Sequence, residues 1–226
     1  NIGEQSYRQG SNRHFKDLID SGQYKEKKLR YLEITPSNLC NLACRSCSSN
    51  FSSKWVPIDN FIASDRQKKS VAFTDWTTLD LSNLIELKLM GGEPMMLESN
   101  RRLLKFLQEK NKLKDIHLHF ITNLTKSLSD EWKELLIECR RVSIFVSIDG
   151  IGNLNEYIRS GSSWKTTEKN LLSIIEFSKV NTSIIVSSNS VISLFNVNKT
   201  LELESYFQKL GIRYFLDTTS FPTYID

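Results

Sequence analysis

Cysteine, glycine and proline are all scarce in this chain, whose 226 residues include 4 Cys, 9 Gly and 4 Pro. So few cysteines, with no signal peptide at the start of the sequence, argue against the disulfide framework of a small secreted protein. No apolar run approaches the length needed to cross a bilayer, so we expect a soluble, cytoplasmic protein. An excess of one charge is also lacking, because 30 Lys and Arg residues oppose 26 Asp and Glu residues. The resulting net charge of +4 is too mild to indicate nucleic acid as a partner.

An alternation of short β-rich runs and longer helical patterns begins near residue 30, and it is typical of a parallel sheet built from strand–helix units. The expected strands cover residues 31–35, 85–90, 116–122, 142–149, 183–191 and 213–218. The amphipathic stretches between them cover residues 100–109, 129–139, 165–179 and 199–210. About six such units fall short of the eight that close a full barrel. The sequence therefore predicts an α/β fold, a partial (β/α)6 TIM-like barrel with parallel strands and outer helices.

Side chains of the expected strand 142–149 divide into an apolar face and a more polar one, the latter formed by Ser143, Phe145, Ser147 and Asp149. The two neighbouring strands divide in the same way. Because branched apolar side chains normally fill a closed barrel, a polar inner face predicts an incomplete barrel with a water-filled cavity for a ligand.

Three of the four cysteines, Cys40, Cys44 and Cys47, lie in one run directly after the first expected strand. Thiolates are the usual ligands of iron–sulfur clusters, and three of them leave one iron without a protein ligand. Structural zinc needs four ligands in closely spaced pairs. The remaining Cys139 precedes a strand, at the opposite rim, where a buried small hydrophobic residue is expected. We therefore favour an iron–sulfur cluster over zinc, a disulfide with a spare thiol, or chance.

Further motifs follow the next strands at their carboxyl ends, the edge where enzymes built from strand–helix units place their active sites. The segment Gly-Gly-Glu-Pro at 91–94 follows the second strand, Asn123 ends the third, and Ser-Ile-Asp-Gly at 147–150 ends the fourth. Two glycines let the backbone approach a ligand closely. Exposed carbonyls at such a strand end can accept hydrogen bonds from an ammonium group.

The Cys-x3-Cys-x2-Cys spacing, the Gly-Gly-Glu-Pro segment and the order of the elements together resemble the radical S-adenosylmethionine (SAM) enzymes, from about Tyr31 to the last strand. The resemblance implies a [4Fe-4S] cluster whose open iron is chelated by the amino and carboxylate groups of SAM. It implies an oxidoreductase that takes one electron from a donor such as a flavodoxin or ferredoxin, forms a 5′-deoxyadenosyl radical and abstracts hydrogen from a peptide or small-molecule substrate.

The same resemblance suggests individual roles. It implies that the cluster ligands are Cys40, Cys44 and Cys47, and that the SAM contacts are Gly91, Gly92, Glu93, Pro94, Ser147, Asp149 and Arg159. Ser147 and Arg159 resemble the pair that holds the methionine carboxylate in peptide-modifying members, and Asp149 is a candidate for a ribose hydroxyl. A strand-end turn or a surface ion pair explains each of these three residues equally well. Ser46 stands where the family often has an aromatic residue, so packing beside the adenine must come from elsewhere.

The segment 155–161, with Gly3, Ser6, Arg8 and Asn12, looks like the Twitch and SPASM-type members, many of which carry an additional cluster. The sequence has no cysteines left to ligate such an additional cluster, and it begins without methionine. We therefore expect a fragment of a longer protein, with further cysteines beyond its ends. We expect a helical lead-in over 1–29, the partial barrel over 30–218 and the start of an extension over 219–226.

Two alternatives remain open at this stage. One is an iron–sulfur binding or electron-transfer module without radical chemistry. The other concerns the inner-facing Glu86, Lys88, His117 and His119, which are candidates for substrate contact but equally well explained as paired structural polar groups.

Overall fold

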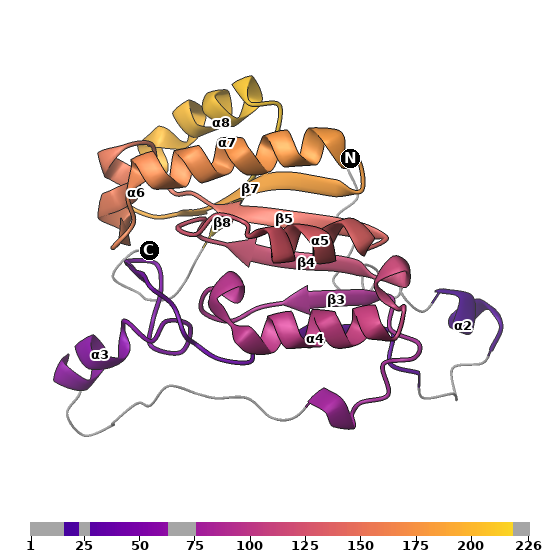
Figure 1. Cartoon of the computed structure of the whole chain (residues 1–226). Helices are drawn as coiled ribbons and strands as arrows, with labels where there is room; N and C mark the ends of the chain where they lie inside the picture. Colours follow the sequence, from indigo (N-terminus) through magenta and orange to yellow (C-terminus); the bar gives the residue numbers. More distant parts are fainter. Residues whose placement is uncertain (1–15, 23–27, 63–75, 219–226) are drawn as a thin grey trace.

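The computed structural model describes residues 16–22, 28–62 and 76–218, and its core is a six-stranded sheet with helices along one face (Figure 1). The strands are β1 (Tyr31–Ile34), β3 (Glu86–Leu89), β4 (His117–Thr122), β5 (Arg141–Ser147), β7 (Ile184–Ile192) and β8 (Arg213–Thr218). They are ordered β1-β3-β4-β5-β7-β8, and every neighbouring pair is parallel. All six expected strands are confirmed, with bounds that differ by no more than two residues.

The connections between these strands are mainly helical, as parallel pairing requires. The longer helices are α4 (Glu98–Glu109), α5 (Asp130–Glu138), α7 (Trp164–Val180) and α8 (Thr200–Lys209), which confirms the four expected helices. Shorter helices are α2 (Lys16–Asp20), α3 (Val56–Ile62) and α6 (Asn153–Ile158), and 3-10 turns cover Trp76–Thr78, Pro94–Met96, Leu113–Asp115 and Val197–Lys199. Among the described strands, β1 and β8 end the order without pairing to each other, so this sheet is open and the predicted partial barrel is confirmed.

The hydrophobic core lies between the sheet and these helices. On β5, Val142, Ile144 and Val146 are fully buried, in one cluster with Leu104 of α4 and Leu171 of α7. Burying each such side chain stabilises the fold by about 1.5–3 kcal/mol relative to leaving it exposed. The alternation predicted from the sequence therefore assigns the correct face of the strand to the helices.

The opposite face of the sheet is polar over much of its area, as expected. Strand register places Lys88 of β3 beside His119 of β4, which in turn lies beside Ser143 of β5. Lys88 forms an ion pair with Glu33 of β1, at 3.2 Å between Nζ and Oε2. None of these four polar side chains is fully buried, in contrast to the apolar side chains on the other face of the sheet.

A second, very small sheet escapes prediction from the sequence. It pairs β2 (Ala43–Cys44) with β6 (Arg159–Ser160) in antiparallel fashion, so that Cys44 lies opposite Arg159. Residues 1–15, 23–27 and 219–226 lie outside the described part, so most of the expected lead-in and the expected extension are untested.

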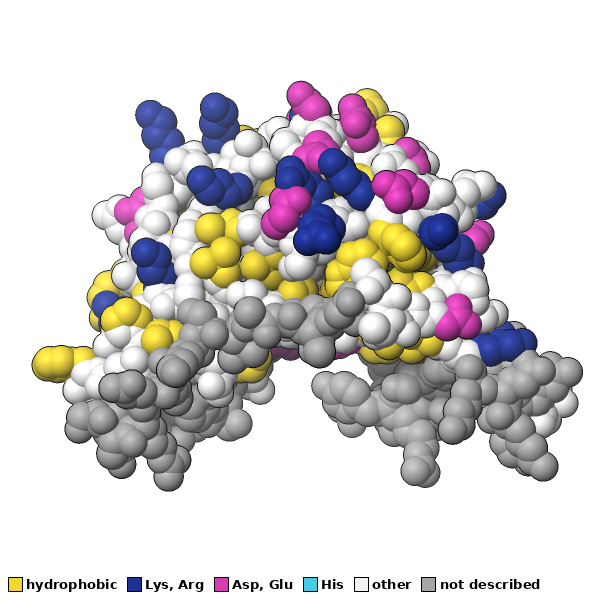
Figure 2. All heavy atoms as spheres, turned by 60° about the horizontal axis from the view of Figure 1, so that its bottom comes forward, with side chains coloured by type: hydrophobic (Ala, Val, Ile, Leu, Met, Phe, Trp, Pro, Cys, Tyr) yellow, Lys and Arg dark blue, Asp and Glu magenta, His cyan; other side chains and the backbone are white. Residues whose placement is uncertain are grey.

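The surface carries both signs of charge. Basic and acidic side chains are interspersed on the face shown in Figure 2. Ion pairs contribute to such mixing, for example Arg101 of α4 with Glu131 of α5, at 2.5 Å between Nη1 and Oε2. Within the described residues, no helix combines the length and apolar character needed to cross a membrane.

Candidate functional site

A cavity of about 250 Å³ opens at the carboxyl ends of the strands, among the loops that follow β1, β3, β4 and β5. Eight of the ten residues that the sequence suggests for the cluster or for SAM line this cavity, namely Cys40, Cys44, Cys47, Gly91, Gly92, Pro94, Ser147 and Arg159. Glu93 and Asp149 are not among the lining residues. One cavity thus brings together three thiols, a glycine-rich strand end and a guanidinium group.

Side chains of the segment that follows the cysteine run hold the backbone of that run in place. The indole Nε1 of Trp55 donates to the carbonyl oxygen of Cys44 at 2.8 Å, and Ser52 Oγ donates to the carbonyl of Leu42 at 2.6 Å. Ser53 Oγ lies 3.2 Å from both the amide nitrogen and the carbonyl oxygen of Cys40. The backbone of the loop is therefore fixed by the residues immediately after it, and its thiols are left to face the cavity.

The two glycines after β3 let that strand end dock on the cysteine loop. A Cβ atom on Gly92 would lie 2.2 Å from the carbonyl oxygen of Leu39, and one on Gly91, whose φ is 120°, would lie 2.6 Å from that of Ser37. Backbone hydrogen bonds at 3.1 Å from Gly92 to Ser37 and at 2.9 Å from Glu93 to Leu39 join the two segments. The close approach that the glycines permit here is to the chain's own loop.

Glu93 stabilises the site from behind the cavity wall. Its carboxylate accepts hydrogen bonds from the backbone N–H of Asn123 at 2.8 Å, from Thr122 Oγ1 at 2.8 Å and from the backbone N–H of Met95 at 3.2 Å. Burial raises the pKa of this carboxyl group, and the hydrogen bonds oppose that rise. The side chain therefore ties the end of β4 to the Gly-Gly-Glu-Pro turn, and the geometry favours a positioning role over direct contact with a ligand.

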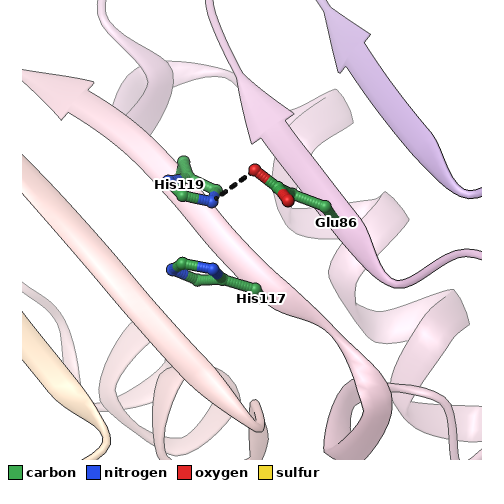
Figure 3. Close-up of side chains that lie close together, drawn as sticks. All are labelled: Glu86, His117 and His119. Carbon is green, nitrogen blue, oxygen red and sulfur yellow. Dashed lines mark ion pairs between the residues drawn. The ribbon is translucent and has the colours of Figure 1, made fainter. Parts of the chain in front are cut away.

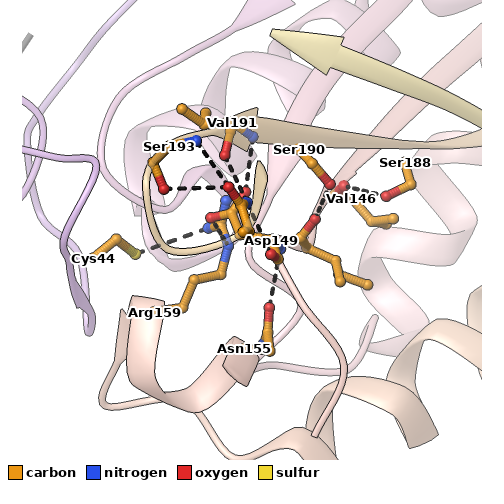
Figure 4. A network of polar contacts seen from close by, with 11 residues as sticks. Cys44, Val146, Asp149, Asn155, Arg159, Ser188, Ser190, Val191 and Ser193 are labelled. Atoms are coloured by element: carbon orange, nitrogen blue, oxygen red, sulfur yellow. Dashed lines mark hydrogen bonds and ion pairs between the residues drawn. The ribbon is translucent and has the colours of Figure 1, made fainter. Parts of the chain in front are cut away.

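Arg159 is buried beside the cysteine loop, and Figure 4 shows the polar network around it. Its Nε lies 2.9 Å from Asp149 Oδ2, and its Nη1 lies 3.8 Å from the Cys44 sulfur. The other carboxylate oxygen of Asp149 accepts from the backbone N–H of Val191 at 2.8 Å, and the Asp149 N–H donates to Asn155 Oδ1 at 3.1 Å. Because Asp149 is fully buried by these partners, its geometry favours orienting Arg159 over holding a ribose hydroxyl.

The three thiols share an environment that disfavours free thiolates. Burial raises the pKa of Cys44 to about 12 and that of Cys47 to about 11, and it also raises the pKa of Cys40. The positive charge of Arg159 opposes the rise at all three sulfurs. A metal centre replaces the protons of such thiols, so the set suits a bound cluster better than a reactive free cysteine.

The sequence places Asn123 at this edge of the sheet but assigns it no role, and the structure shows that it also lines the cavity. Its Nδ2 lies 3.8 Å from the Cys40 sulfur and 3.1 Å from Asn41 Oδ1, and its Oδ1 accepts from the Thr125 backbone N–H at 2.9 Å. An amide donor directed at a ligand sulfur tunes the potential of an iron–sulfur cluster. Its position at a strand end beside the other motifs was the only signal available in the sequence.

Cys139 lies far from this cavity, at the end of α5 and just before β5 begins. It belongs to the main hydrophobic core, and its sulfur contacts the carbonyl oxygen of Leu135 at 3.4 Å. Ser147, by contrast, ends β5 at the cavity itself. Cys139 thus lies before the start of β5 and Ser147 at its end, which agrees with the expectation that Cys139 is a structural residue.

Comparison with known proteins identifies the family. Residues 37–173 match the family described as a 4Fe-4S single cluster domain. This match covers more than half of the chain, and the chain belongs to that family. A GTP 3′,8-cyclase of Clostridium botulinum (strain Hall) is 23% identical over 193 residues, which are 81% of this chain and 57% of the relative. The chain thus spans little more than half the length of this relative.

Solved structures share the fold. Native anSMEcpe with bound AdoMet has a TM-score of 0.61 at 19% identity, covering 84% of this chain and 52% of that one. Streptococcus suis SuiB bound to the precursor peptide SuiA also has a TM-score of 0.61 at 19% identity, covering 100% of this chain and 48% of that one. The radical S-adenosylmethionine methyltransferase TsrM from Kitasatospora setae has a TM-score of 0.56 at 11% identity, over 88% of this chain and 38% of that one. Family and fold together confirm the resemblance to radical SAM enzymes.

Proposed function

We propose that this chain binds a [4Fe-4S] cluster through Cys40, Cys44 and Cys47, binds SAM beside it, and acts as a radical SAM enzyme. The observation that carries the proposal is the convergence of the three thiols, the Gly91–Gly92 strand end and the Arg159 guanidinium on one cavity. An electron-transfer module needs the thiols alone. The additional cationic and backbone groups at the cavity are those that an amino-acid ligand requires.

The residues present fit both groups. Three cysteine thiols on one short loop can hold three irons of a cube and leave the fourth open. When bound, the cluster and SAM supply a 5′-deoxyadenosyl radical by one-electron reductive cleavage, and this radical abstracts hydrogen from the substrate. We take the electron to come from a donor such as a flavodoxin or ferredoxin.

For SAM, we assign the methionine carboxylate to Arg159 and Ser147, because a guanidinium fixed by Asp149 presents a planar, charged donor. We assign the ammonium group to the strand end at Gly91 and Gly92, where backbone carbonyls are the acceptors. Among the described residues that line the cavity, Phe51 is the aromatic one, and it is 58% exposed. We assign to Phe51 the apolar contact with the adenine, because Ser46 replaces the aromatic residue that the family often has before the third cysteine.

A peptide is the substrate class that we favour. SuiB, which shares the fold, is seen bound to its precursor peptide, and anSMEcpe with a Cp18Cys peptide. The inner face of the sheet adds a second cavity of about 290 Å³, whose lining includes Phe145, Asn189, Phe215 and Asp217. Aromatic and hydrogen-bonding groups side by side suit an amide backbone with apolar side chains. A nucleotide, as for the GTP 3′,8-cyclases, is the alternative to test.

The decisive assay is anaerobic. The protein is reconstituted with iron and sulfide, reduced in the presence of SAM, and examined for 5′-deoxyadenosine by chromatography. We expect 5′-deoxyadenosine from the wild type and none from Cys44→Ala. A fully loaded cluster without any 5′-deoxyadenosine, under reduction strong enough to bleach it, would favour the electron-transfer alternative.

A further inference from the structure

A second cluster of metal-binding side chains lies on the inner face of the sheet, and it belongs to neither the cysteine loop nor the SAM assignment. Glu86 of β3 and His117 and His119 of β4 lie side by side there (Figure 3). Each offers one ligand atom, and these three atoms all lie within 4.8 Å of one another. Figure 3 also shows the ion pair that joins His119 to Glu86.

The strand geometry dictates this arrangement. Residues two apart on a strand point to the same face, so His117 and His119 share the inner side of β4. Parallel register then places Glu86 directly beside His117. The two imidazole rings are 3.8 Å apart between centroids, and His119 Nε2 lies 2.9 Å from Glu86 Oε1.

We propose that Glu86, His117 and His119 form a binding site for a divalent transition-metal ion, for which zinc is the best match. Two imidazoles and one carboxylate are a ligand set typical of zinc and of non-haem iron, whereas magnesium and calcium prefer oxygen ligands alone. The three ligand atoms already lie within 4.8 Å of one another, so rotations of the side chains can bring them around one ion.

A neighbouring hydroxyl supports this assignment. Metal-bound histidines usually have a hydrogen-bond partner for the second ring nitrogen, which fixes the orientation of the ring. Ser143 Oγ lies 2.8 Å from Nε2 of His117. The Ser143 hydroxyl can therefore fix the orientation of the His117 ring in this way.

The site is separate from the cysteine cavity and adjoins the second one. Glu86 and His117 begin their strands, whereas the cysteine cavity lies beyond the carboxyl ends of the same sheet. His119 also lines the cavity of about 290 Å³, beside Lys88. Three protein ligands leave a coordination position open, which water or an anionic group of a molecule in that cavity can fill.

Zinc titration of the cluster-loaded protein tests the proposal, because iron then occupies the thiols that would otherwise compete. The reconstituted protein is dialysed anaerobically against a chelator, transferred to chelator-free buffer and titrated with Zn²⁺ by calorimetry. We expect one equivalent per chain in the wild type. His119→Ala and Glu86→Gln should each weaken binding at least ~10-fold, since each removes a ligand.

Lys88→Ala is the matched control, because it removes a neighbouring polar side chain of the same face and should retain the full stoichiometry. The iron content of every variant shows whether it has folded. Absence of zinc binding by the wild type, or equal affinity in the wild type and His119→Ala, would overturn the proposal. If a variant fails to fold, X-ray absorption of the zinc-loaded wild type decides, because sulfur in the zinc coordination shell would also overturn it.

Discussion

Arg159 is the side chain on which the assignment of SAM depends most. It is 8% exposed, it is paired with the fully buried Asp149, and it stands opposite Cys44 in the small antiparallel sheet. Its Nε faces the Asp149 carboxylate, its Nη1 faces the Cys44 sulfur, and the side chain lines the cavity. The sequence alone explains Arg159 equally well as part of a surface ion pair. The structure instead makes it a buried positive charge next to three cysteines.

The first prediction is that Arg159→Lys weakens SAM binding at least ~10-fold, or by about 1.4 kcal/mol, while the cluster stays intact. Lysine keeps the charge beside Asp149 but loses the planar two-pronged donor. Anaerobic calorimetry with SAM, paired with iron analysis, measures both properties. The matched control is Arg45→Lys, since Arg45 stacks on the Tyr157 ring at 4.0 Å and is not among the cavity-lining residues. Equal affinity in the wild type and Arg159→Lys would remove Arg159 from the SAM site.

The second prediction separates the four cysteines. Cys44→Ala should lose most of the iron after reconstitution, because a cube held by two thiolates is exposed to solvent and dissociates. Cys139→Ala should keep the full iron content and lose only about 1 kcal/mol of stability, since it removes a small buried side chain. Iron and sulfide analysis with absorption spectra of the two variants makes the comparison. Loss of the chromophore in both would show that the assignment of ligands is wrong.

At this level the sequence predicted which residues gather at the cavity but not the residues that orient them. Spacing identifies Cys40, Cys44 and Cys47 because their chemistry is unusual in a chain with few cysteines. Asn123 and Trp55 carry no such signal, since an amide or an indole has many ordinary uses. Their roles depend on contacts over 83 and 11 positions of the chain, which only the folded structure reveals.

Docking of the β3 turn on the cysteine loop is the contact between segments that shapes the cavity. It depends on Gly92, where a Cβ atom would overlap the carbonyl oxygen of Leu39. Backbone atoms cannot move aside as a flexible side chain can. The glycine pair therefore serves the architecture of the site first, and this packing leaves the strand end facing the cavity.

The third prediction is that Gly92→Ala destabilises the protein by about 3 kcal/mol, the upper end of the range for overpacking, and impairs cluster assembly. Urea unfolding and iron content give the two readouts. Gly211→Ala is the control, because Gly211 has a positive φ, 72°, but a Cβ atom added there would meet nothing within 4 Å. It should cost about 1 kcal/mol through backbone strain alone and leave the iron content unchanged. Similar iron loss in the two variants would contradict the docking account.

Periodicity predicted the strands and helices well because each is long enough for a repeating pattern to be visible. The two-residue strands β2 and β6 have no such pattern. They pair across 115 positions of the chain, and the pairing arises only after α6 has turned the chain back toward the cysteine loop. Tertiary packing, rather than local propensity, determines them.

The open sheet gives the molecule an uneven distribution of stability. β5 is central in the strand order, and its residues that face the helices are fully buried. β8, by contrast, pairs only with β7 among the described strands and is largely exposed. Opening of β8 breaks one ladder, while opening of β5 breaks two and disrupts the core. Local unfolding therefore costs less at β8.

The fourth prediction concerns hydrogen exchange. Peptides from β4 and β5 should exchange slowest, with protection close to that of global unfolding, and peptides from β8 should exchange at least ~10-fold faster. Exchange followed by mass spectrometry on the cluster-loaded protein measures both regions at once. Protection of β8 equal to that of β5 would mean that the edge is covered in solution.

The central claim is that cluster and SAM share one cavity, with SAM bound to the open iron. Electron paramagnetic resonance of the reduced, cluster-loaded protein, recorded with and without SAM, tests this most directly. We predict that SAM changes the signal of the reduced cluster in the wild type, and that at the same SAM concentration the change is smaller in Arg159→Lys. A spectrum that saturating SAM leaves unchanged in the wild type would contradict the account.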